Sequence, residues 1–241
     1  MNLLVDFLLR TGFGMALGLV LTPAAAVPAG FFRVNLLVIM GGATFAALAL
    51  AGAGAEWLLP AAAAVIAWVG GILWLAGRTR GGIVACLACM KLLATATLLR
   101  GGWTEGPVAL VSGALVGLTL HAMLLGHWYL NAPGMRVDVL RRMIDVALVA
   151  WGIEACVALP GLLGMLATVS SSQPPDRATL ALEALRGIGG IVGLPVLLVM
   201  SRQTLAIPNT QSATGILYVA CLAAITGDLA ARLLALPTAV G

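Results

Sequence analysis

Two histidines, His121 and His127, are the residues of this sequence that most readily suggest chemistry, and both fall within one apolar run, 107–130. An imidazole changes charge near neutral pH, so it can carry protons, contact a quinone or ligate a metal. His127 follows His121 by six residues, which rotates it by about 240° around a helix. The two rings therefore cannot ligate one haem iron from this helix. A haem would need a methionine or a ligand from a partner subunit.

His121 shares a helix face with Gly113 and Gly117, at spacings of four and eight residues. Small residues let a second helix approach closely, so this face is expected to contact protein and not lipid. Two interpretations of His121 stay open. It either has a packing and hydrogen-bonding role, or it acts as a proton relay, quinone contact or metal ligand.

The string Gly-His-Trp-Tyr-Leu-Asn at 126–131 ends the same run. Trp and Tyr are typical of the membrane interface, which accounts for the string without any chemistry. The alternative is that His127 and Tyr129 form a site for a lipid headgroup or a quinone ring at that depth.

Charged residues inside apolar runs are costly in a membrane and suggest function by default. Lys91 lies near the centre of one run and Glu154 lies deep in another. We expect Lys91 and Glu154 to form an ion pair. Alternatively, Glu154 carries a proton.

Three further pairs of opposite charge lie at helical spacing, where the two side chains are neighbours. They are Asp228 and Arg232, Asp6 and Arg10, and Glu183 and Arg186. Each pair either neutralises itself to reduce the cost of insertion, or the three converge into one outward-facing polar cluster on an ion or quinone path.

The amino-acid composition indicates what kind of structure holds these residues. The 241 residues are 61% hydrophobic and 9% charged, whereas soluble domains are about 45–50% apolar and about 25% charged. Soluble enzymes, nucleic-acid modules, disordered regulators and disulfide-rich secreted domains are therefore excluded, and no nucleic-acid partner is expected. All four cysteines lie in apolar runs, where Cys packs as a small hydrophobe.

A spanning helix needs about 20 mostly apolar residues. Eight runs fit: 3–21, 35–54, 57–76, 83–99, 107–130, 143–167, 180–201 and 215–236. The sequence predicts an all-α integral membrane bundle of about eight transmembrane helices in the lipid bilayer. It forms one transmembrane domain, 1–241, with no soluble domain. The first six residues contain no Lys or Arg, so the first run is expected to be a retained helix and not a signal peptide.

Basic residues in loops predict orientation, because cytoplasmic loops carry an excess of Lys and Arg. One side of the predicted bundle carries Arg33, Arg78, Arg80, Arg136, Arg141, Arg142 and Arg202. The opposite side carries Arg10, Arg100 and Arg177. Both termini are therefore expected outside a bacterial cytoplasmic (inner) membrane.

The strings His-Trp-Tyr at 127–129 and Thr-Gln-Ser-Ala-Thr-Gly at 210–215 resemble strings in uncharacterised bacterial polytopic membrane proteins. Eight helices with both ends outside, and an acid followed by Arg in the last helix (Asp228, Arg232), are loosely similar to quinol-handling membrane anchors of respiratory oxidoreductases. This resemblance implies contact with quinone and with partner subunits.

We therefore expect a multi-pass inner-membrane protein that is a non-catalytic subunit of a larger bioenergetic or redox assembly. It would anchor other membrane subunits, contact a quinone or haem held with them, or line a proton path. We do not expect an enzyme by itself, since the sequence has no P-loop, HExxH or nucleophile elbow. The candidate residues are His121, His127, Tyr129, Lys91, Glu154, Asp228 and Arg232.

The alternative function is a small-solute or ion transporter acting alone or as a homo-oligomer. Transporters of this kind bind their solute where helices are interrupted. Gly and Pro residues at 187–195 and at Pro160 and Gly161 predict such breaks.

Overall fold

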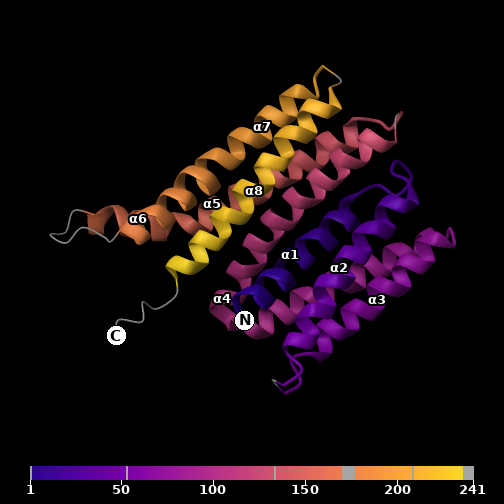
Figure 1. Cartoon of the computed structure of the whole chain (residues 1–241), viewed down its shortest axis with the longest axis horizontal. Helices are drawn as coiled ribbons and strands as arrows, with labels where there is room; N and C mark the ends of the chain where they lie inside the picture. The colour runs from indigo at the N-terminus through magenta and orange to yellow at the C-terminus, as the bar shows by residue number, and fades with distance from the viewer. Residues whose placement is uncertain (1, 53, 133, 170–176, 208, 236–241) are drawn as a thin grey trace.

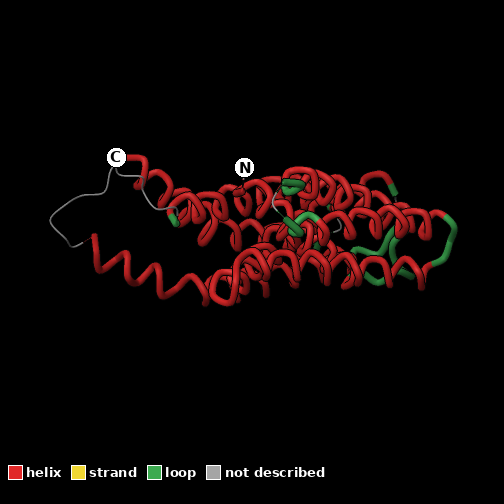
Figure 2. Tube along the Cα trace, turned by 90° about the horizontal axis from the view of Figure 1, so that it is seen from below, coloured by secondary structure: helices red, strands yellow, loops and turns green. Residues whose placement is uncertain are grey.

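The structure of the chain is a computed structural model. It describes residues 2–52, 54–132, 134–169, 177–207 and 209–235, together with their side chains except those of residues 2 and 160–169. The described residues form helices and connecting loops, with no strand among them (Figure 2). The predicted all-α class is confirmed.

The helices are long and lie roughly side by side (Figure 1). In chain order they are α1 (Asn2–Leu21), α2 (Ala29–Ala49), α3 (Leu58–Leu75), α4 (Thr79–Asn131), α5 (Asp138–Val169), α6 (Arg177–Ala184), the π-helix η1 (Leu185–Gly193), α7 (Leu194–Thr204) and α8 (Thr210–Leu234).

Helix α4 bends sharply at Gly102, whose φ of 64° and ψ of −165° lie outside the helical region. Glycine adopts a positive φ without the steric penalty that a Cβ atom brings. The chain turns back here, so that a Cβ atom on Gly106 would lie 3.1 Å from the backbone of Leu98. The bend divides α4 into a first arm, 79–101, and a second arm, 103–131.

Helix α1 lies between the two arms. A Cβ atom on Gly12 would meet the side chain of Leu93 in the first arm at 3.1 Å, and one on Gly14 would lie 2.9 Å from Cα of Gly117 in the second arm. The backbones of α1 and the second arm therefore touch. The close approach predicted from the small residues on the His121 face is confirmed.

On one side of α1 and the second arm lie α2, α3 and the first arm, and on the other side lie α5, α7 and α8 (Figure 1). We call the end of the bundle that holds Gly102 the bend end. The first residues of α1 and the last residues of α8 also lie there, since Leu3 and Ala235 line one cavity.

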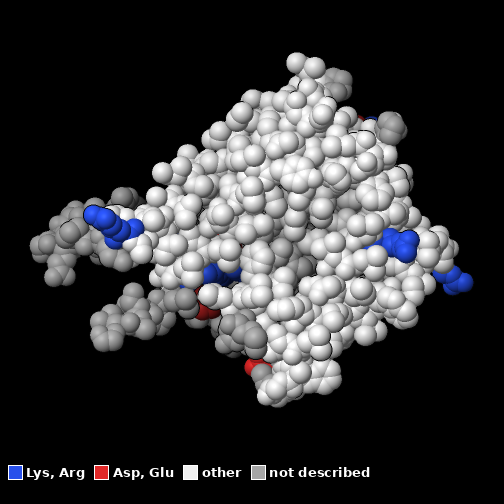
Figure 3. Space-filling view, in the orientation of Figure 1, with Lys and Arg blue, Asp and Glu red and all other residues white. Residues whose placement is uncertain are grey.

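The outer surface of the bundle is apolar. Large side chains such as Leu48, Val65 and Trp68 are 73%, 59% and 54% exposed on α2 and α3. On the face shown in Figure 3, charged side chains gather nearer the ends of the helices than their middles. A surface of this kind suits a lipid environment, because soluble proteins rarely expose such extensive apolar patches.

Six segments of the described chain are long and apolar enough to cross a membrane. They are Leu3–Leu21, Ala29–Ala49, Leu58–Leu75, Thr79–Asn131, Arg177–Thr204 and Thr210–Leu234. The chain is thus a helical, apolar bundle compatible with a multi-pass membrane protein. The predicted count of eight and the outside location of both termini stay predictions.

Some predicted boundaries were wrong. The second helix begins at Ala29 and not near residue 35, directly after Pro28. Proline is well tolerated where a helix begins, because the first turn has no partners for its N–H groups. The helix also begins early because Phe31 and Phe32 are buried there, each 1% exposed.

The predicted interruption at 187–195 takes the form of the π-helix η1, in which the chain stays helical. Pro195 has no N–H to donate to the carbonyl of Ile191, four residues earlier. The indole Nε1 of Trp151 on α5 donates to that carbonyl instead, at 3.1 Å. The second predicted break is not formed, since α5 is helical through residues 160 and 161.

Candidate functional site

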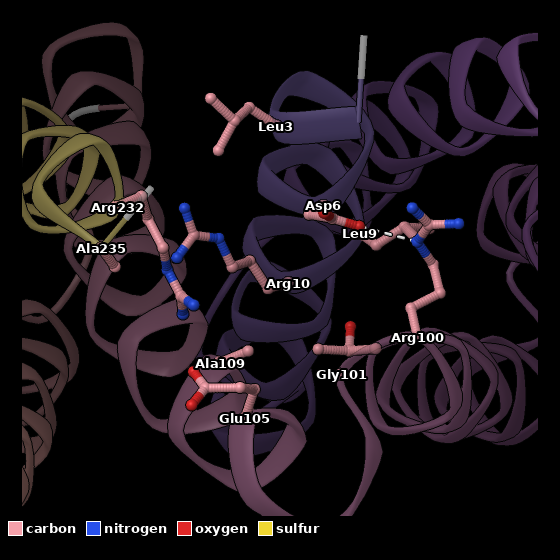
Figure 4. Close-up of a pocket in the computed structure, with 11 residues that line it drawn as sticks. Leu3, Asp6, Leu9, Arg10, Arg100, Gly101, Glu105, Ala109, Arg232 and Ala235 are labelled. Atoms are coloured by element: carbon pink, nitrogen blue, oxygen red, sulfur yellow. Dashed lines mark hydrogen bonds and ion pairs between the residues drawn. The ribbon is translucent and has the colours of Figure 1, made fainter. Parts of the chain in front are cut away.

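A cavity of about 300 Å³ opens between α1, the bend of α4 and α8. Its charged lining residues are Asp6, Arg10, Arg100, Glu105 and Arg232, drawn in Figure 4. We call it the charged cavity. Its walls come from segments more than 200 positions apart in the sequence.

The deepest contact of this region is an ion pair between α1 and α8. Arg10 donates from Nη1 to Oδ1 of Asp228 at 2.7 Å and from Nη2 to Oδ2 at 2.5 Å. The two side chains are 3% and 7% exposed. A two-bond Arg–carboxylate contact satisfies the donors and acceptors that burial removes from water, and it fixes the two helices relative to each other.

Ser112, in the second arm of α4, brings a second guanidinium group to this pair. Its hydroxyl oxygen accepts from Nη1 of Arg10 and from Nη2 of Arg232, both at 3.1 Å. Two like charges about 5 Å apart repel by roughly 3 kcal/mol at an effective dielectric constant of about 20. Arg10 has Asp228 as its counter-charge, whereas Arg232 forms no ion pair with any described residue.

Arg100, at the end of the first arm, holds a separate group of charges. Its Nε donates to Asp6 at 2.7 Å and its Nη1 donates to Glu56, which precedes α3. In Figure 4 this group lies across α1 from Arg10 and Arg232. Arg100 therefore joins α1, α3 and the bend, and its charge is already matched by two carboxylates.

A second, smaller cavity of about 50 Å³ lies on the other side of the Arg10–Asp228 pair. Its polar lining includes Ser112, Glu154, Arg186 and Asp228, and Gly190 of the π-helix also borders it. Oε2 of Glu154 is buried without a hydrogen-bond partner. The network of Arg10, Asp228 and Ser112 thus forms the wall between the charged cavity and this small cavity.

The predicted local pairs in α1 and α8 are not formed. Asp228 binds Arg10 instead of Arg232, and Asp6 binds Arg100 instead of Arg10. Exposed helical neighbours gain only about 0.2–0.5 kcal/mol from pairing, so buried contacts between helices outcompete them. Of the alternative expectation, convergence of the three pairs into one polar cluster, only part is seen: Arg10, Asp228 and Arg232 meet, whereas Asp6 belongs to the separate group around Arg100.

The predicted ion pair between Lys91 and Glu154 is wrong. Lys91 is exposed on the outward side of the first arm, and no ion pair involves it within the described ranges. Glu154 instead faces the small cavity on α5. The sequence placed both residues at a similar depth but held no information on which helices pack together.

His121 is fully buried where α1 crosses the second arm. Its Nε2 lies 2.8 Å from the hydroxyl of Thr22, which donates to the carbonyl of Gly18 at 2.8 Å. The same hydroxyl lies 3.6 Å from Sδ of Met143, and Nδ1 of His121 is buried without a hydrogen-bond partner among the described residues. His121 also packs edge-on against Phe31, with ring centroids 5.2 Å apart.

His127 and Tyr129, the two candidates near the end of α4, point to different surroundings. His127 is exposed, and its Nδ1 lies 3.1 Å from the hydroxyl of Tyr218 on α8. Tyr129 is buried and donates its hydroxyl to the backbone carbonyl of Arg136 in the following loop. The two candidates therefore do not line one site, and the different faces predicted for His121 and His127 are confirmed.

Three contributors to the site were missed by the sequence analysis: Ser112, Glu105 and Glu56. Ser112 is an ordinary polar residue in an apolar helix, although its position one residue before Gly113 places it near the α1 contact. Glu105 follows the Gly-Gly pair at 101–102, where the chain turns. The gap between the predicted runs 83–99 and 107–130 includes this turn, but the proximity of the turn to α8 was not predicted.

No group of three or more His, Cys, Asp or Glu side chains suited to a metal occurs in the part of the chain that the structure describes. The fold and site define an apolar helical bundle with a charged cavity at one end. No family model matches the sequence, and no curated protein or solved structure is significantly similar to it. A function for this chain is therefore inferred from the geometry of the charged cavity.

Proposed function

We propose that this chain is a carrier for a small charged solute in a bacterial inner membrane, acting alone or as a homo-oligomer. The observation that carries this proposal is the charged cavity. Five ionisable side chains surround about 300 Å³ of space at one end of an otherwise apolar bundle. Ionisable residues within membrane segments usually mark the pathway of a solute or ion.

The wall beneath the cavity supports a carrier more than an open channel. The Arg10–Asp228 pair closes the charged cavity toward the small cavity, and the next polar group along the second arm, Thr119, donates to the carbonyl of Leu115 within its own helix. Carriers open to one side at a time. A cavity closed at its base is the expected form of such a protein when open toward the bend end.

The π-helix η1 provides a candidate moving part. A π-helical turn is often found at functional sites because it departs from regular backbone hydrogen bonding. Gly190 packs against Gly227 of α8, one position before Asp228, so a Cβ atom on Gly190 would lie 3.1 Å from Cα of Gly227. A shift of η1 along α8 would therefore reach the ion pair directly.

We further propose that the chain crosses the membrane eight times and that both termini lie outside. The bend at Gly102 divides one of the six apolar segments into two arms, and α5, Asp138–Val169, is long enough to cross as well. The chain then starts and ends at the bend end. The arginines counted in the sequence place that end outside.

The experiment is transport into proteoliposomes that contain the purified full chain with its four cysteines replaced by alanine. Labelled acetate, inorganic phosphate, glycine and rubidium are the probes. In Glu105→Cys, modification by a bulky thiol reagent should block uptake, because residue 105 lines the cavity. Trp103→Cys is the matched control, since Trp103 is 98% exposed. Folded protein that moves none of the four probes would contradict the proposal.

A second candidate is the membrane subunit of a redox assembly, with partner subunits that hold a quinone or haem. One observation favours it: His127 and Tyr218 form an exposed hydrogen-bonded pair on α4 and α8, at the opposite end from the charged cavity. Exposed aromatic and imidazole groups there suit a quinone ring or a partner surface. Purification in mild detergent, followed by mass spectrometry and pigment analysis, separates the two candidates. Stoichiometric redox subunits or haem would favour the assembly, whereas a chain free of both favours the carrier.

A further inference from the structure

We propose that Arg232 is the docking point for an anionic group, a carboxylate or a phosphate, that enters the charged cavity. This inference rests on the proposed function, because it names the class of solute that the cavity takes. It also applies if the anion is a lipid headgroup, since the two sources share the same chemistry.

Among the described residues, Arg232 lacks the close counter-charge that Arg10 has. Arg10 and Arg232 both donate to Ser112, so their guanidinium groups are close neighbours. Asp228 neutralises Arg10 through both of its carboxylate oxygens. Arg232 has no described carboxylate within ion-pair distance, so Asp228 and Glu154 act on its charge only from farther away.

Most donors of Arg232 are not used by Ser112. A guanidinium group has five N–H donors, and Arg232 binds Ser112 through one of its nitrogens, Nη2. The side chain lines the charged cavity, where it stands next to Arg10 and faces open space (Figure 4). The remaining donors of the Arg232 guanidinium group match the oxygens of a carboxylate or phosphate.

The volume of the cavity suits a small ligand. A cavity of about 300 Å³ has room for a small organic anion or a single headgroup phosphate.

Glu105 places a negative charge of the protein in the same cavity, where it opposes the binding of an anion. It lines the same cavity but forms no ion pair within the described residues. A carboxylate at this place repels an incoming anion. Removing its charge by Glu105→Gln should therefore strengthen anion binding.

The experiment measures binding of labelled acetate and labelled inorganic phosphate to the purified full chain by scintillation proximity. The wild-type chain should bind at least one of them saturably. Arg232→Gln should weaken that binding at least tenfold, and Glu105→Gln should strengthen it several-fold. Arg177→Gln is the matched control, because Arg177 is an exposed arginine outside the cavity and its loss should change the affinity less than twofold.

Arg232→Lys keeps the test valid if Arg232→Gln does not fold, because an ammonium group keeps the charge but not the planar fork. It should bind several-fold more weakly than the wild type. Binding to Arg232→Gln that equals wild-type binding would overturn the proposal, and so would the absence of saturable binding of both probes to the wild type.

Nanodiscs distinguish the two sources of the anion. If a headgroup is the resident anion, discs of phosphatidylglycerol should lower the affinity for the probes relative to discs of phosphatidylcholine, and only when Arg232 is present. Equal affinity in the two discs identifies a free solute. Both results support an anion site at Arg232.

The proposed function fails separately from this inference. Anion binding that depends on Arg232, without transport of any probe, supports the site and contradicts the carrier. Transport of rubidium or glycine that is indifferent to Arg232→Gln supports the carrier and overturns the anion site.

Discussion

Arg10 and Asp228 form a two-bond ion pair that joins the first helix to the last, across 218 positions of sequence. Both side chains are almost completely buried. The pair also closes the base of the charged cavity, so it links the stability of the bundle to the shape of the site.

Asp228→Asn should destabilise the bundle by about 3–5 kcal/mol, because breaking a buried pair leaves an uncompensated charge. The measurement is thermal or denaturant unfolding in detergent. Combining it with Arg10→Gln should cost less than the sum of the two single changes, since neither member of the pair then leaves the other one charged and without its partner. Asp145→Asn is the control: Asp145 pairs with Arg202 but both are nearly half exposed, so about 0–1 kcal/mol is expected. Equal losses from Asp228→Asn and Asp145→Asn would contradict the burial argument.

Gly14→Ala should prevent the close packing of α1 against the second arm of α4. A Cβ atom there would lie 2.9 Å from Cα of Gly117, and backbone cannot move aside as a flexible side chain can. We expect a large loss of folded, monodisperse protein in size-exclusion chromatography. Gly41→Ala provides the comparison, because its Cβ would meet nothing within 4 Å. That change should be neutral or slightly stabilising, since Ala favours helix.

Trp151→Phe should lower stability by about 1–3 kcal/mol, because the carbonyl of Ile191 would lose its donor next to Pro195. The effect should appear as a lower midpoint of unfolding and as faster amide exchange in η1. Trp68→Phe tests the same substitution at a side chain that is 54% exposed, where little change is expected. An unaltered midpoint for Trp151→Phe would show that the π-helix does not need this hydrogen bond.

The proposed topology predicts the sides from which single cysteines can be labelled in the cysteine-free background. Trp103→Cys at the bend end should react with a membrane-impermeant reagent added outside intact cells. Asn131→Cys, exposed at the opposite end of α4, should react only after the cells are opened. The reverse pattern would invert the orientation and place the charged cavity in the cytoplasm.

Periodicity and composition predicted the parts of this fold that depend on local sequence. Small residues at Gly113 and Gly117 indicated a helix contact, and the gap between the apolar runs 83–99 and 107–130 indicated a connection where the bend at Gly102 lies. The helix that packs against these residues could not be predicted. A stripe of small residues indicates close packing but does not identify the neighbouring helix.

The candidate site shows the same limit. Asp228 and Arg232 were identified as charges that matter, but their partners were predicted within the same helix. Arg10 and Ser112 reach them from α1 and the second arm. Such contacts depend on which helices are neighbours in the bundle. A helix that is hydrophobic on all sides carries little information about its neighbours.

The ion pair also has a consequence for biogenesis. Arg10 emerges from the ribosome early, whereas Asp228 follows 218 residues later. At a synthesis rate of about 5–20 residues per second, Arg10 waits about 10–45 s for its carboxylate. During that interval α1 carries an unneutralised guanidinium group in the bilayer. A chain truncated before α8 lacks this carboxylate, so the charge of Arg10 stays without its partner for the lifetime of that chain.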